Sequence, residues 1–328
     1  MVFEPAYLKL YNSGELKKRN DDAEKLLISC RICPQDCLID RTKDQLGKCL
    51  SGYLPIVSAY TAHFGEEPVL SGTNGAGNIF FGNCNLKCLY CQNSDISQNW
   101  KNENKNQVSF ERLADIMIEL QEKKCHNIGL VSPTHFASQI IRSIDIAIGK
   151  GLNLPIIYNT NGYDSVEVLK LYDGIIDIYL PDFKYGNNEY AKKYSKIDRY
   201  VDKTKLALKE MYRQLGDEVI YDGNILVRGM IIRHLVLPND LSETEEVLKF
   251  IANELSNKIH LSIMSQYYPT FHANRDILID RTIRESEYNR VLRLLDKYGF
   301  ENVFTQEIES FETYRPDFQK NREKPFSF

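Results

Sequence analysis

The amino-acid sequence predicts an α/β fold with parallel strands, arranged either as a partial barrel or as an open sheet. Two patterns predict it. From residue 78 onward, short runs of β-branched and apolar residues recur, and helix-like segments separate them. Such runs indicate strands that are buried on both faces, and their alternation with helices indicates right-handed crossover connections.

Six predicted strands share this short apolar pattern and lack the alternation of a strand that is exposed on one face. In chain order they are NIFFG (78–82), NIGLVS (127–132), LPIIYNT (154–160), IDIYLPDF (176–183), NILVRGMIIRHLVL (224–237) and IHLSIMSQY (259–267).

The segments between the strands have the apolar spacing of amphipathic helices. The fifth segment opens with Ser242, and Glu245 follows three positions later, which predicts a capping box at its first turn. The sixth segment follows the last strand, so six strand-plus-helix units are predicted. The segments are residues 109–124, 136–150, 165–173, 189–216, 242–256 and 284–299.

The two ends of the chain do not continue this alternation. Residues 1–77 contain four cysteines, the alternating stretch PIVSAYTAHF and the glycine-rich stretch SGTNGAGN, which we interpret as a turn or joint. Residues 301–328 end in the charged stretch YRPDFQKNREKPFSF, which predicts an extended or poorly ordered end. We therefore predict an N-terminal cysteine-rich, metal-binding appendage (1–77), a barrel or sheet domain (78–300) and a C-terminal extension (301–328).

Composition narrows the class of protein. The 328 residues are 43% apolar and 26% charged, with a formal net charge of -4. This balance gives no electrostatic reason to expect nucleic acid or an anionic membrane as a partner. The chain has no apolar stretch long enough to cross a bilayer, and its N-terminus lacks the features of a signal peptide. We expect a cytoplasmic protein.

Cysteine spacing is the most informative feature of the sequence. A reducing cytosol disfavours disulfides, so clustered cysteines are better interpreted as metal or catalytic ligands. Seven of the eight cysteines fall into two groups, and Cys125 stands alone. The first group is Cys30, Cys33, Cys37 and Cys49, and the second is Cys84, Cys88 and Cys91.

The second group has three thiols where a simple electron-carrying cluster would have four. A cluster of four irons and four sulfurs has four iron corners, and a cysteine thiolate normally binds each of them. The spacing C-x3-C-x2-C at Cys84, Cys88 and Cys91 leaves one iron without a protein ligand. An open coordination position indicates a catalytic rather than a structural metal centre.

Polar residues follow each of the other predicted strands. They occur in SPTH (132–135), NTNGY (159–163), PDFK (181–184), the pair Arg233 and His234, and SQYYP (265–269). In a barrel of parallel strands, catalytic groups gather at the carboxyl ends. Strand ends are commonly polar in any protein, so the coincidence with three cysteines is what favours an active site.

Cys84, Cys88, Tyr90 and Cys91 form the pattern C-x3-C-x-aromatic-C, which resembles the signature of radical S-adenosylmethionine (SAM) enzymes. Stretches such as RGMIIRHLVLPN and LSIMSQYYP resemble the subgroup that is similar to pyruvate formate-lyase activating enzyme. The resemblance covers most of the chain. It implies a partial (β/α)6 barrel of the radical SAM type, a 4Fe-4S cluster and SAM.

The resemblance also implies a chemistry. SAM would chelate the open iron, and one electron from the reduced cluster would cleave it to methionine and a 5'-deoxyadenosyl radical, which abstracts hydrogen from a substrate. The substrate is open, and the glycine of a glycyl-radical enzyme is one candidate. The implied electron donor is a protein such as flavodoxin or ferredoxin.

Roles for single residues follow from the same resemblance. Tyr90 matches the aromatic residue that lies near the adenine. The family usually places Gly-Gly-Glu after the second strand to hold the SAM amino group, whereas this chain has Ser132 and Thr134 in SPTH. We expect these two residues to supply the contact.

Further cofactor-binding residues are expected after the later strands. Asn159 and Asn161 resemble an element that faces SAM, and Asp182 and Lys184 resemble the acid-x-lysine pair of glycyl-radical activases. Arg233 closes the fifth strand, where its positive charge could meet the SAM carboxylate or the substrate.

The first cysteine group has the spacing C-x2-C-x3-C-x11-C. Four thiols complete the coordination of either a zinc ion or a second iron-sulfur cluster, and thiolates alone do not distinguish the two. We predict a second metal site at this quartet.

An alternative function belongs to a different class, that of an iron-sulfur electron-transfer or metal-binding protein without SAM turnover. Such a protein would need a fourth cysteine near the cluster and would have no use for a ring of polar strand ends. Both features favour the enzyme.

Overall fold

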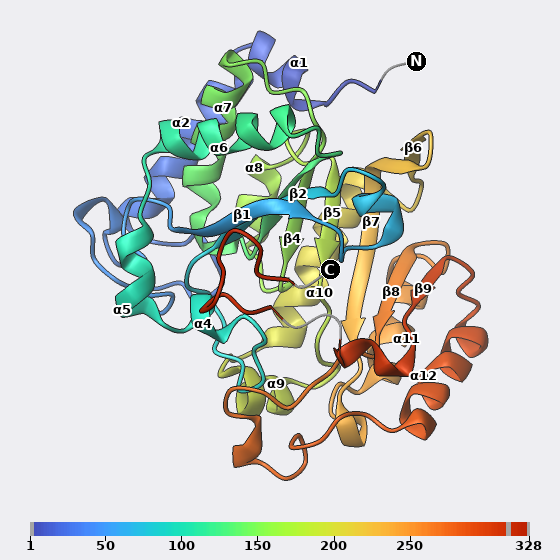
Figure 1. The fold of residues 1–328 in the computed structure, drawn as a ribbon. Helices are drawn as coiled ribbons and strands as arrows, with labels where there is room; N and C mark the ends of the chain where they lie inside the picture. The colour runs from blue at the N-terminus through green and yellow to red at the C-terminus, as the bar shows by residue number, and fades with distance from the viewer. Residues whose placement is uncertain (1–2, 313–315, 327–328) are drawn as a thin grey trace.

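The computed structural model describes residues 3–312 and 316–326 and has a mixed α/β fold around one nine-stranded sheet (Figure 1). The strand order is β1-β2-β3-β4-β5-β7-β8-β9, and β6 pairs with β7. The strands are β1 (Val57–His63), β2 (Ala76–Phe81), β3 (Ile128–Val131), β4 (Ile156–Thr160), β5 (Ile178–Pro181), β6 (Ile220–Asp222), β7 (Ile225–Leu235), β8 (His260–Met264) and β9 (Val303–Thr305).

Most neighbours in this sheet are parallel, as the apolar runs predict. β1 is antiparallel to β2 and β6 is antiparallel to β7, while every pair from β2 to β9 along the main path is parallel. The carboxyl ends of β2, β3, β4, β5, β7 and β8 therefore meet at one edge. These are the six strands that the sequence predicts.

Helices follow most of the parallel strands and cover the sheet (Figure 1). The helices are α1 (Tyr7–Asn12), α2 (Glu15–Ile28), α3 (Pro68–Ser71), α4 (Ser94–Ser97), α5 (Trp100–Glu103), α6 (Phe110–Glu122), α7 (Ala137–Gly149), α8 (Val166–Leu171), α9 (Asn188–Ser195), α10 (Tyr200–Leu215), α11 (Thr244–Glu254) and α12 (Glu285–Tyr298).

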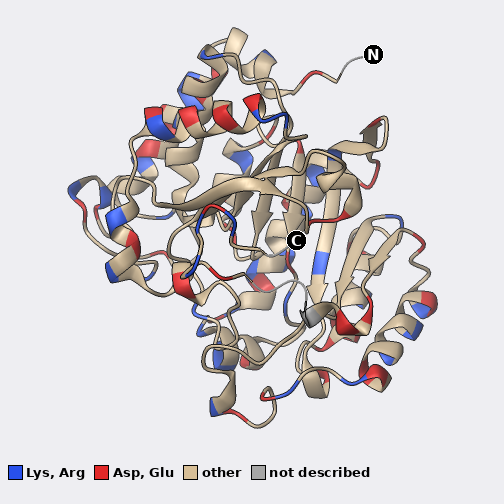
Figure 2. Cartoon of the chain, in the orientation of Figure 1, with Lys and Arg blue, Asp and Glu red and all other residues tan. Residues whose placement is uncertain are grey.

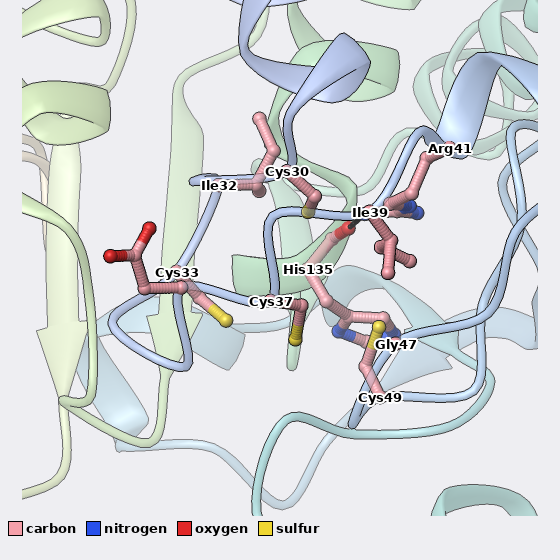
Figure 3. Close-up of a pocket in the computed structure, with 10 residues that line it drawn as sticks. Cys30, Ile32, Cys33, Cys37, Ile39, Arg41, Gly47, Cys49 and His135 are labelled. Carbon is pink, nitrogen blue, oxygen red and sulfur yellow. Dashed lines mark hydrogen bonds between the residues drawn. The ribbon is translucent and has the colours of Figure 1, made fainter.

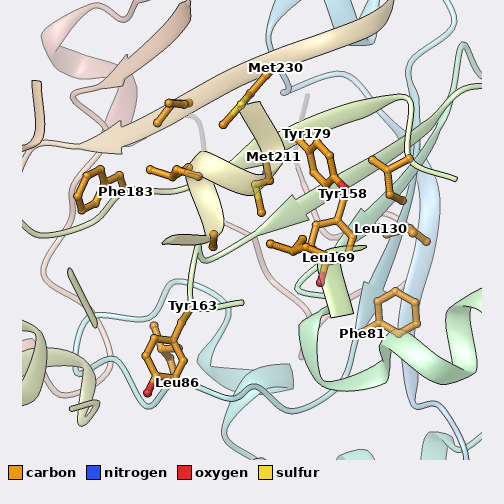
Figure 4. Close-up of a cluster of buried hydrophobic side chains, with 14 of the residues drawn as sticks. Phe81, Leu86, Leu130, Tyr158, Tyr163, Leu169, Tyr179, Phe183, Met211 and Met230 are labelled. Atoms are coloured by element: carbon orange, nitrogen blue, oxygen red, sulfur yellow. The ribbon is translucent and has the colours of Figure 1, made fainter. Parts of the chain in front are cut away.

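The main core lies between the sheet and these helices (Figure 4). Successive strand residues point to opposite faces, so Leu130, Tyr158 and Tyr179 enter this core, where Leu169 of α8 and Met211 of α10 also lie. Other strand residues form smaller apolar clusters, such as Ile157, Leu180 and Ile231. Burial on both faces explains why the strands are continuously apolar.

Two helix predictions are wrong. The single helix predicted over residues 189–216 is two helices, α9 and α10, because Lys196 and Arg199 adopt left-handed conformations with φ of 57° and 56°. The capping box predicted at Ser242 is absent from α11. Glu243 has a left-handed conformation there, and the Ser242 hydroxyl instead lies 3.2 Å from that of Thr244.

The N-terminal segment contributes to the same sheet. β1 lies within the stretch PIVSAYTAHF, and it pairs with β2 across the boundary predicted at residue 77. Helix α2 packs against α7. Residues 3–77 are therefore joined to the rest of the described chain by a strand and by a helix, and a division at residue 77 stays a prediction.

The C-terminal segment packs more closely than its composition predicts. Residues 316–326 cross in front of the sheet (Figure 1, red). Phe318 is buried, and its ring centroid lies 5.4 Å from that of Phe80 on β2. Residues 316–326 form no helix or strand, which agrees with the extended alternative of the prediction, while residues 313–315, 327 and 328 lie outside the described residues.

Charged residues of both signs alternate on the outer helices in Figure 2, whereas the central strands are mostly uncharged. Among the helices of residues 3–312 and 316–326, none combines the length and the apolar character needed to cross a membrane.

Asp177 gives the fold a testable pH dependence. It is buried, and its carboxylate accepts hydrogen bonds from the backbone N–H groups of Ile156 and Ala6. Burial raises its pKa to about 7. The folded protein therefore holds this proton more tightly than the unfolded chain, and stability should fall as the pH rises from about 4 to about 7.

We expect Asp177→Asn to remove this pH dependence of stability, because asparagine does not titrate and still accepts one hydrogen bond. Urea unfolding at about pH 4 and about pH 8 should show the variant gaining stability relative to the unmodified protein at the higher pH. Parallel stability profiles for the two proteins would show that folding does not raise the pKa of Asp177.

Candidate active site

A cavity of about 500 Å³ opens at the carboxyl ends of the parallel strands. Loops after β2, β3, β4 and β5 form its walls together with the ends of β7 and β8. This is the edge at which α/β folds place their chemistry. The predicted residues that line the cavity are Cys84, Cys88, Tyr90, Cys91, Ser132, Asn159, Asn161, Asp182, Lys184 and Arg233.

The loop after β2 holds the three thiols, which are half-buried. Asn83 starts the loop with φ of 64°, a conformation that asparagine tolerates better than most residues. The backbone N–H groups of Lys87 and Leu89 then donate to carbonyl oxygens of Ser195 and Tyr194 at 3.0 and 2.8 Å. These two bonds fasten the loop to the end of α9.

Each of the three sulfurs has a side-chain hydrogen-bond donor nearby. Donors around a sulfur stabilise the thiolate, which is the form that binds metal. The surroundings therefore suit metal-bound thiolates. The pairs are Asn161 Nδ2 with Cys84 Sγ at 3.6 Å, Ser195 Oγ with Cys88 Sγ at 3.0 Å, and Ser97 Oγ with Cys91 Sγ at 3.2 Å.

Tyr90 is a buried residue of this loop and belongs to a chain of hydroxyl groups. Its hydroxyl lies 2.6 Å from that of Tyr185, which lies 2.7 Å from Ser195 Oγ. A metal-bound thiolate can only accept a hydrogen bond. The consistent order is then donation from Tyr90 to Tyr185, from Tyr185 to Ser195, and from Ser195 to the sulfur of Cys88.

Asp182 and Lys184 follow β5 and form a largely buried ion pair, with Nζ 2.5 Å from Oδ2. Burial alone would lower the pKa of Lys184, but Asp182 and the Cys88 thiol raise it above its ordinary value. Burial raises the pKa of the Cys88 thiol to about 12, and Lys184 opposes that rise. Lys184 therefore stabilises negative charge at the cysteine loop.

The residues after β3 and β4 divide between the cavity and the protein interior. Ser132 and Asn159 face the cavity, and the Ser132 N–H donates to the Asn159 carbonyl at 2.9 Å. Thr134 is 1% exposed, lies 3.0 Å from Thr160 Oγ1, and is not among the residues that line the cavity. Asn161 faces the cavity and donates to Asn85 Oδ1 at 2.7 Å.

Arg233 lies in the cavity wall with its guanidinium already paired. Its Nε donates to Glu67 at 2.9 Å, and its NH2 group contacts both Glu66 and Glu67. The side chains of Arg233, Glu66 and Glu67 are 12%, 9% and 6% exposed. Burial would raise the pKa of Glu66, but Arg233 and His63 lower it below its ordinary value. One cation and two carboxylates leave this network net negative.

The C-terminal segment closes one side of the cavity. Pro316 and Phe326 line it, and the Phe326 ring lies 4.2 Å from that of His63. Arg322 forms an ion pair with the buried carboxylate of Glu103 at 2.7 Å, which anchors the segment to α5. The sequence prediction did not include this contribution.

The first cysteine group lines a small pocket of its own (Figure 3). Burial and the neighbouring thiols of Cys49, Cys30 and Cys37 raise the pKa of Cys33 well above its ordinary value, which reflects how close the four thiols are. A Cβ atom at Gly47 would lie 2.9 Å from Cys37 Sγ, so glycine lets the loop close around the thiols.

The radical SAM superfamily is the family whose sequence model matches this chain, at residues 78–251. The chain belongs to the radical SAM superfamily. An uncharacterized protein of Methanocaldococcus jannaschii is 31% identical over 293 residues, covering 86% of this chain and 78% of the relative. A second uncharacterized protein of that organism is 25% identical over 265 residues, covering 74% of this chain and 72% of the relative.

Membership makes this protein a radical SAM enzyme, with a 4Fe-4S cluster and SAM as its cofactors. The residues after β2 fit the cluster, because three thiols with donors at their sulfurs line a cavity large enough for a cofactor. Within the described ranges, no three His, Cys, Asp or Glu side chains are arranged to hold one metal ion. A 4Fe-4S cluster does not need such an arrangement, because each of its thiolates binds a separate iron.

Sequence reasoning missed several residues of this radical SAM site. Ser97 and Ser195 contact the sulfurs, and Tyr185 links Ser195 to Tyr90. Ser195 stands in the charged stretch EYAKKYSK, where no motif marks it. Its contact arises because α9 ends at that residue beside the cysteine loop, which only tertiary structure reveals.

The hydrogen bonds to sulfur lead to a testable prediction. Because a reduced cluster carries more negative charge, a donor at its thiolate stabilises the reduced form. We expect Ser195→Ala to lower the reduction potential of the cluster by on the order of 50 mV, which corresponds to about 1 kcal/mol of lost hydrogen bonding.

An anaerobic redox titration of the reconstituted protein, followed by electron paramagnetic resonance (EPR), measures this potential. Ser143→Ala is the matched control, since Ser143 is a buried serine that bonds only the Gln139 carbonyl within α7 among the contacts described. Equal potentials in the Ser195→Ala and Ser143→Ala variants would show that Ser195 does not influence the cluster.

Proposed function

We propose that Cys84, Cys88 and Cys91 bind the cluster, that one iron is left for SAM, and that the enzyme abstracts a hydrogen atom from a substrate held in the cavity. A single observation carries this proposal. Three half-buried thiols, each with a side-chain donor at its sulfur, line a cavity of about 500 Å³. Family membership favours this enzyme over an electron carrier without SAM turnover.

The bound cofactors would supply one electron and, after cleavage of SAM to methionine, a 5'-deoxyadenosyl radical that removes hydrogen from the substrate. The protein would orient these groups and exclude water. Lys184 would balance the negative charge of the thiolates, and Tyr90 would keep Ser195 aligned on Cys88 through Tyr185. The loops after β3 and β4 would contact SAM through Ser132, Asn159 and Asn161.

Thr134 would act indirectly in this scheme. Its hydroxyl bonds with Thr160, and Thr160 donates to the buried carboxylate of Asp164 at 2.6 Å. This network would hold the backbone of the Ser132 loop against the end of β4. Arg233 would act through Glu66 and Glu67, whose carboxylates stand in the cavity wall.

The finer identity that we propose is an activase of the pyruvate formate-lyase activating type. Its substrate would be a glycine of a partner glycyl-radical enzyme, and its reductant would be flavodoxin or ferredoxin. The protein would be located in the cytoplasm, and its sheet would form a partial barrel. Support comes from Asp182 and Lys184, which resemble the acid-x-lysine pair of activases and line the cavity as an ion pair. We also propose a second metal at the cysteine quartet, which lines a pocket of its own.

The activase proposal can be tested with pyruvate formate-lyase as the probe. The anaerobically reconstituted enzyme with SAM and reductant should produce the EPR signal of a glycyl radical on the probe, and Lys184→Met should produce much less. Arg290→Met is the matched control, because Arg290 and its exposed partner Asp240 are not among the residues that line the cavity. SAM cleavage without a glycyl radical on this probe would overturn the activase role and leave the radical SAM assignment intact.

A further inference from the structure

The cysteine quartet and the catalytic cysteine loop are neighbours in space. Gln35, which stands between Cys33 and Cys37, donates from Nε2 to the carbonyl oxygen of Asn85 at 2.9 Å. Asn85 directly follows Cys84, and the sulfur of Cys84 lies 3.7 Å from its Oδ1. One hydrogen bond therefore connects the quartet segment to the residue beside the first cluster ligand.

A second connection reaches Cys84 from its other side. Asn83 Nδ2 donates to the carbonyl oxygen of Leu50 at 3.1 Å and to Ser51 Oγ at 3.2 Å. Leu50 follows Cys49, the last member of the quartet. The quartet loops therefore hold both chain neighbours of Cys84.

Tyr163 forms a third connection. Its hydroxyl lies 3.3 Å from the carbonyl oxygen of Pro34, next to Cys33, and its own carbonyl accepts from Asn85 Nδ2 at 3.1 Å. Burial, followed by the influence of the Cys33 thiol, raises the pKa of Tyr163 to about 12. The tyrosine thus spans the space between the quartet and the catalytic loop.

The quartet also reaches the protein surface, whereas the catalytic loop faces the cavity. Cys37 is half-buried, and Leu38 beside it is 54% exposed. Cys84, Cys88 and Cys91 line the cavity that SAM and the substrate would fill.

Four thiols suit a fully ligated cluster, because a 4Fe-4S cube has a separate iron for each of four thiolates. The quartet supplies four thiols that line one pocket (Figure 3).

From these contacts we propose that Cys30, Cys33, Cys37 and Cys49 bind a second, fully ligated 4Fe-4S cluster, which passes electrons to the catalytic cluster. The electron transfer to the catalytic cluster rests on the proposed function, whereas the presence of the second cluster does not. A one-electron donor protein reduces the quartet cluster, and the quartet cluster is reoxidised as it reduces the catalytic cluster, so one electron enters and one leaves. Gln35, Asn85 and Tyr163 bridge the two centres.

Metal content tests the site independently of SAM chemistry. The reconstituted protein should hold about eight irons per chain, and the Cys84→Ala/Cys88→Ala/Cys91→Ala variant should keep about four, with the EPR signal of one reduced cluster. Cys30→Ser/Cys33→Ser should also keep about four. Zinc in place of iron in the first variant, or no metal at all, would overturn the second cluster.

The choice of reductant tests the relay. With reduced flavodoxin, Cys30→Ser/Cys33→Ser should form 5'-deoxyadenosine at least tenfold more slowly than the unmodified protein, whereas with dithionite, a small ion that can reach the cavity, the two rates should be similar. Equal rates with flavodoxin would overturn the relay. Failure of the unmodified protein with both reductants would instead overturn the proposed function.

Gln35→Leu covers the case in which the double variant does not fold. It removes the bond to Asn85 and leaves all seven ligands in place. We expect unchanged iron content and slower reduction of the catalytic cluster by flavodoxin in stopped-flow measurements. An unchanged rate would show that this contact is not part of the electron path.

Discussion

Replacing Gly162 with alanine should destabilise the protein by more than about 3 kcal/mol, through left-handed strain and overpacking together. Gly162 has φ of 80° and follows Asn161 at the end of β4. A Cβ atom there would lie 2.2 Å from the carbonyl oxygen of Asp182, a backbone atom that cannot rotate away. The substitution must therefore push apart two loops that carry cavity residues, and iron incorporation should fall as well.

Gly216→Ala is the matched control for this experiment. Gly216 also has a positive φ, of 70°, but a Cβ atom at that position would have no heavy atom within 4 Å. The control should cost about 1–3 kcal/mol from backbone strain alone, because φ of 70° with ψ of -155° is a conformation that residues other than glycine rarely adopt. Urea unfolding of both variants separates the two effects, and equal losses would show that the loops after β4 and β5 can move apart freely.

Replacing Arg233 with methionine should cost about 3–5 kcal/mol of stability, because it leaves two buried carboxylates without their cation. Glu66 and Glu67 are at most 9% exposed, and Asn78 is a further donor to Glu66, at 2.6 Å. The loss should shrink at low pH, since protonation of Glu66, whose pKa Arg233 lowers in the unmodified protein, removes unpaired charge.

Two further variants complete the Arg233 experiment. Arg290→Met breaks an ion pair whose side chains are 48% and 36% exposed, and it should cost no more than about 1 kcal/mol. Adding Glu66→Gln and Glu67→Gln to Arg233→Met should restore most of the stability. If Arg233→Met and Arg290→Met unfold at the same urea concentration, the buried network contributes no more than an exposed pair.

The sequence predicted the parallel strands because burial on both faces requires continuous apolar runs, such as LPIIYNT for β4. The residues predicted to bind the cluster or SAM, other than Thr134, line one cavity, because parallel strands share one carboxyl edge. The break between α9 and α10 was not predictable in this way. Neither Lys196 nor Arg199 is glycine or proline, yet both adopt left-handed conformations. That break places Ser195 beside Cys88, so the same local irregularity hid a contact at the active site.

The capping box at Ser242 failed for a related reason. A motif of two residues assumes a regular entry into the helix, whereas Glu243 has φ of 45° and turns the chain at that point. The ion-pair partners of Arg233 were also not predictable from the sequence, since they lie 166 and 167 positions away along the chain. Patterns in the chain thus located the site, and tertiary contacts decided what each residue does there.

The central claim is that SAM is cleaved at the loop that carries Cys84, Cys88 and Cys91. The most direct measurement is 5'-deoxyadenosine formation by the anaerobically reconstituted, dithionite-reduced protein with SAM. We expect product from the unmodified protein and from Cys125→Ala, which alters a buried thiol outside both cysteine groups, and none from Cys88→Ala. Absence of product from unmodified protein with a reduced cluster and candidate substrates present, or undiminished product from Cys88→Ala, would contradict the claim.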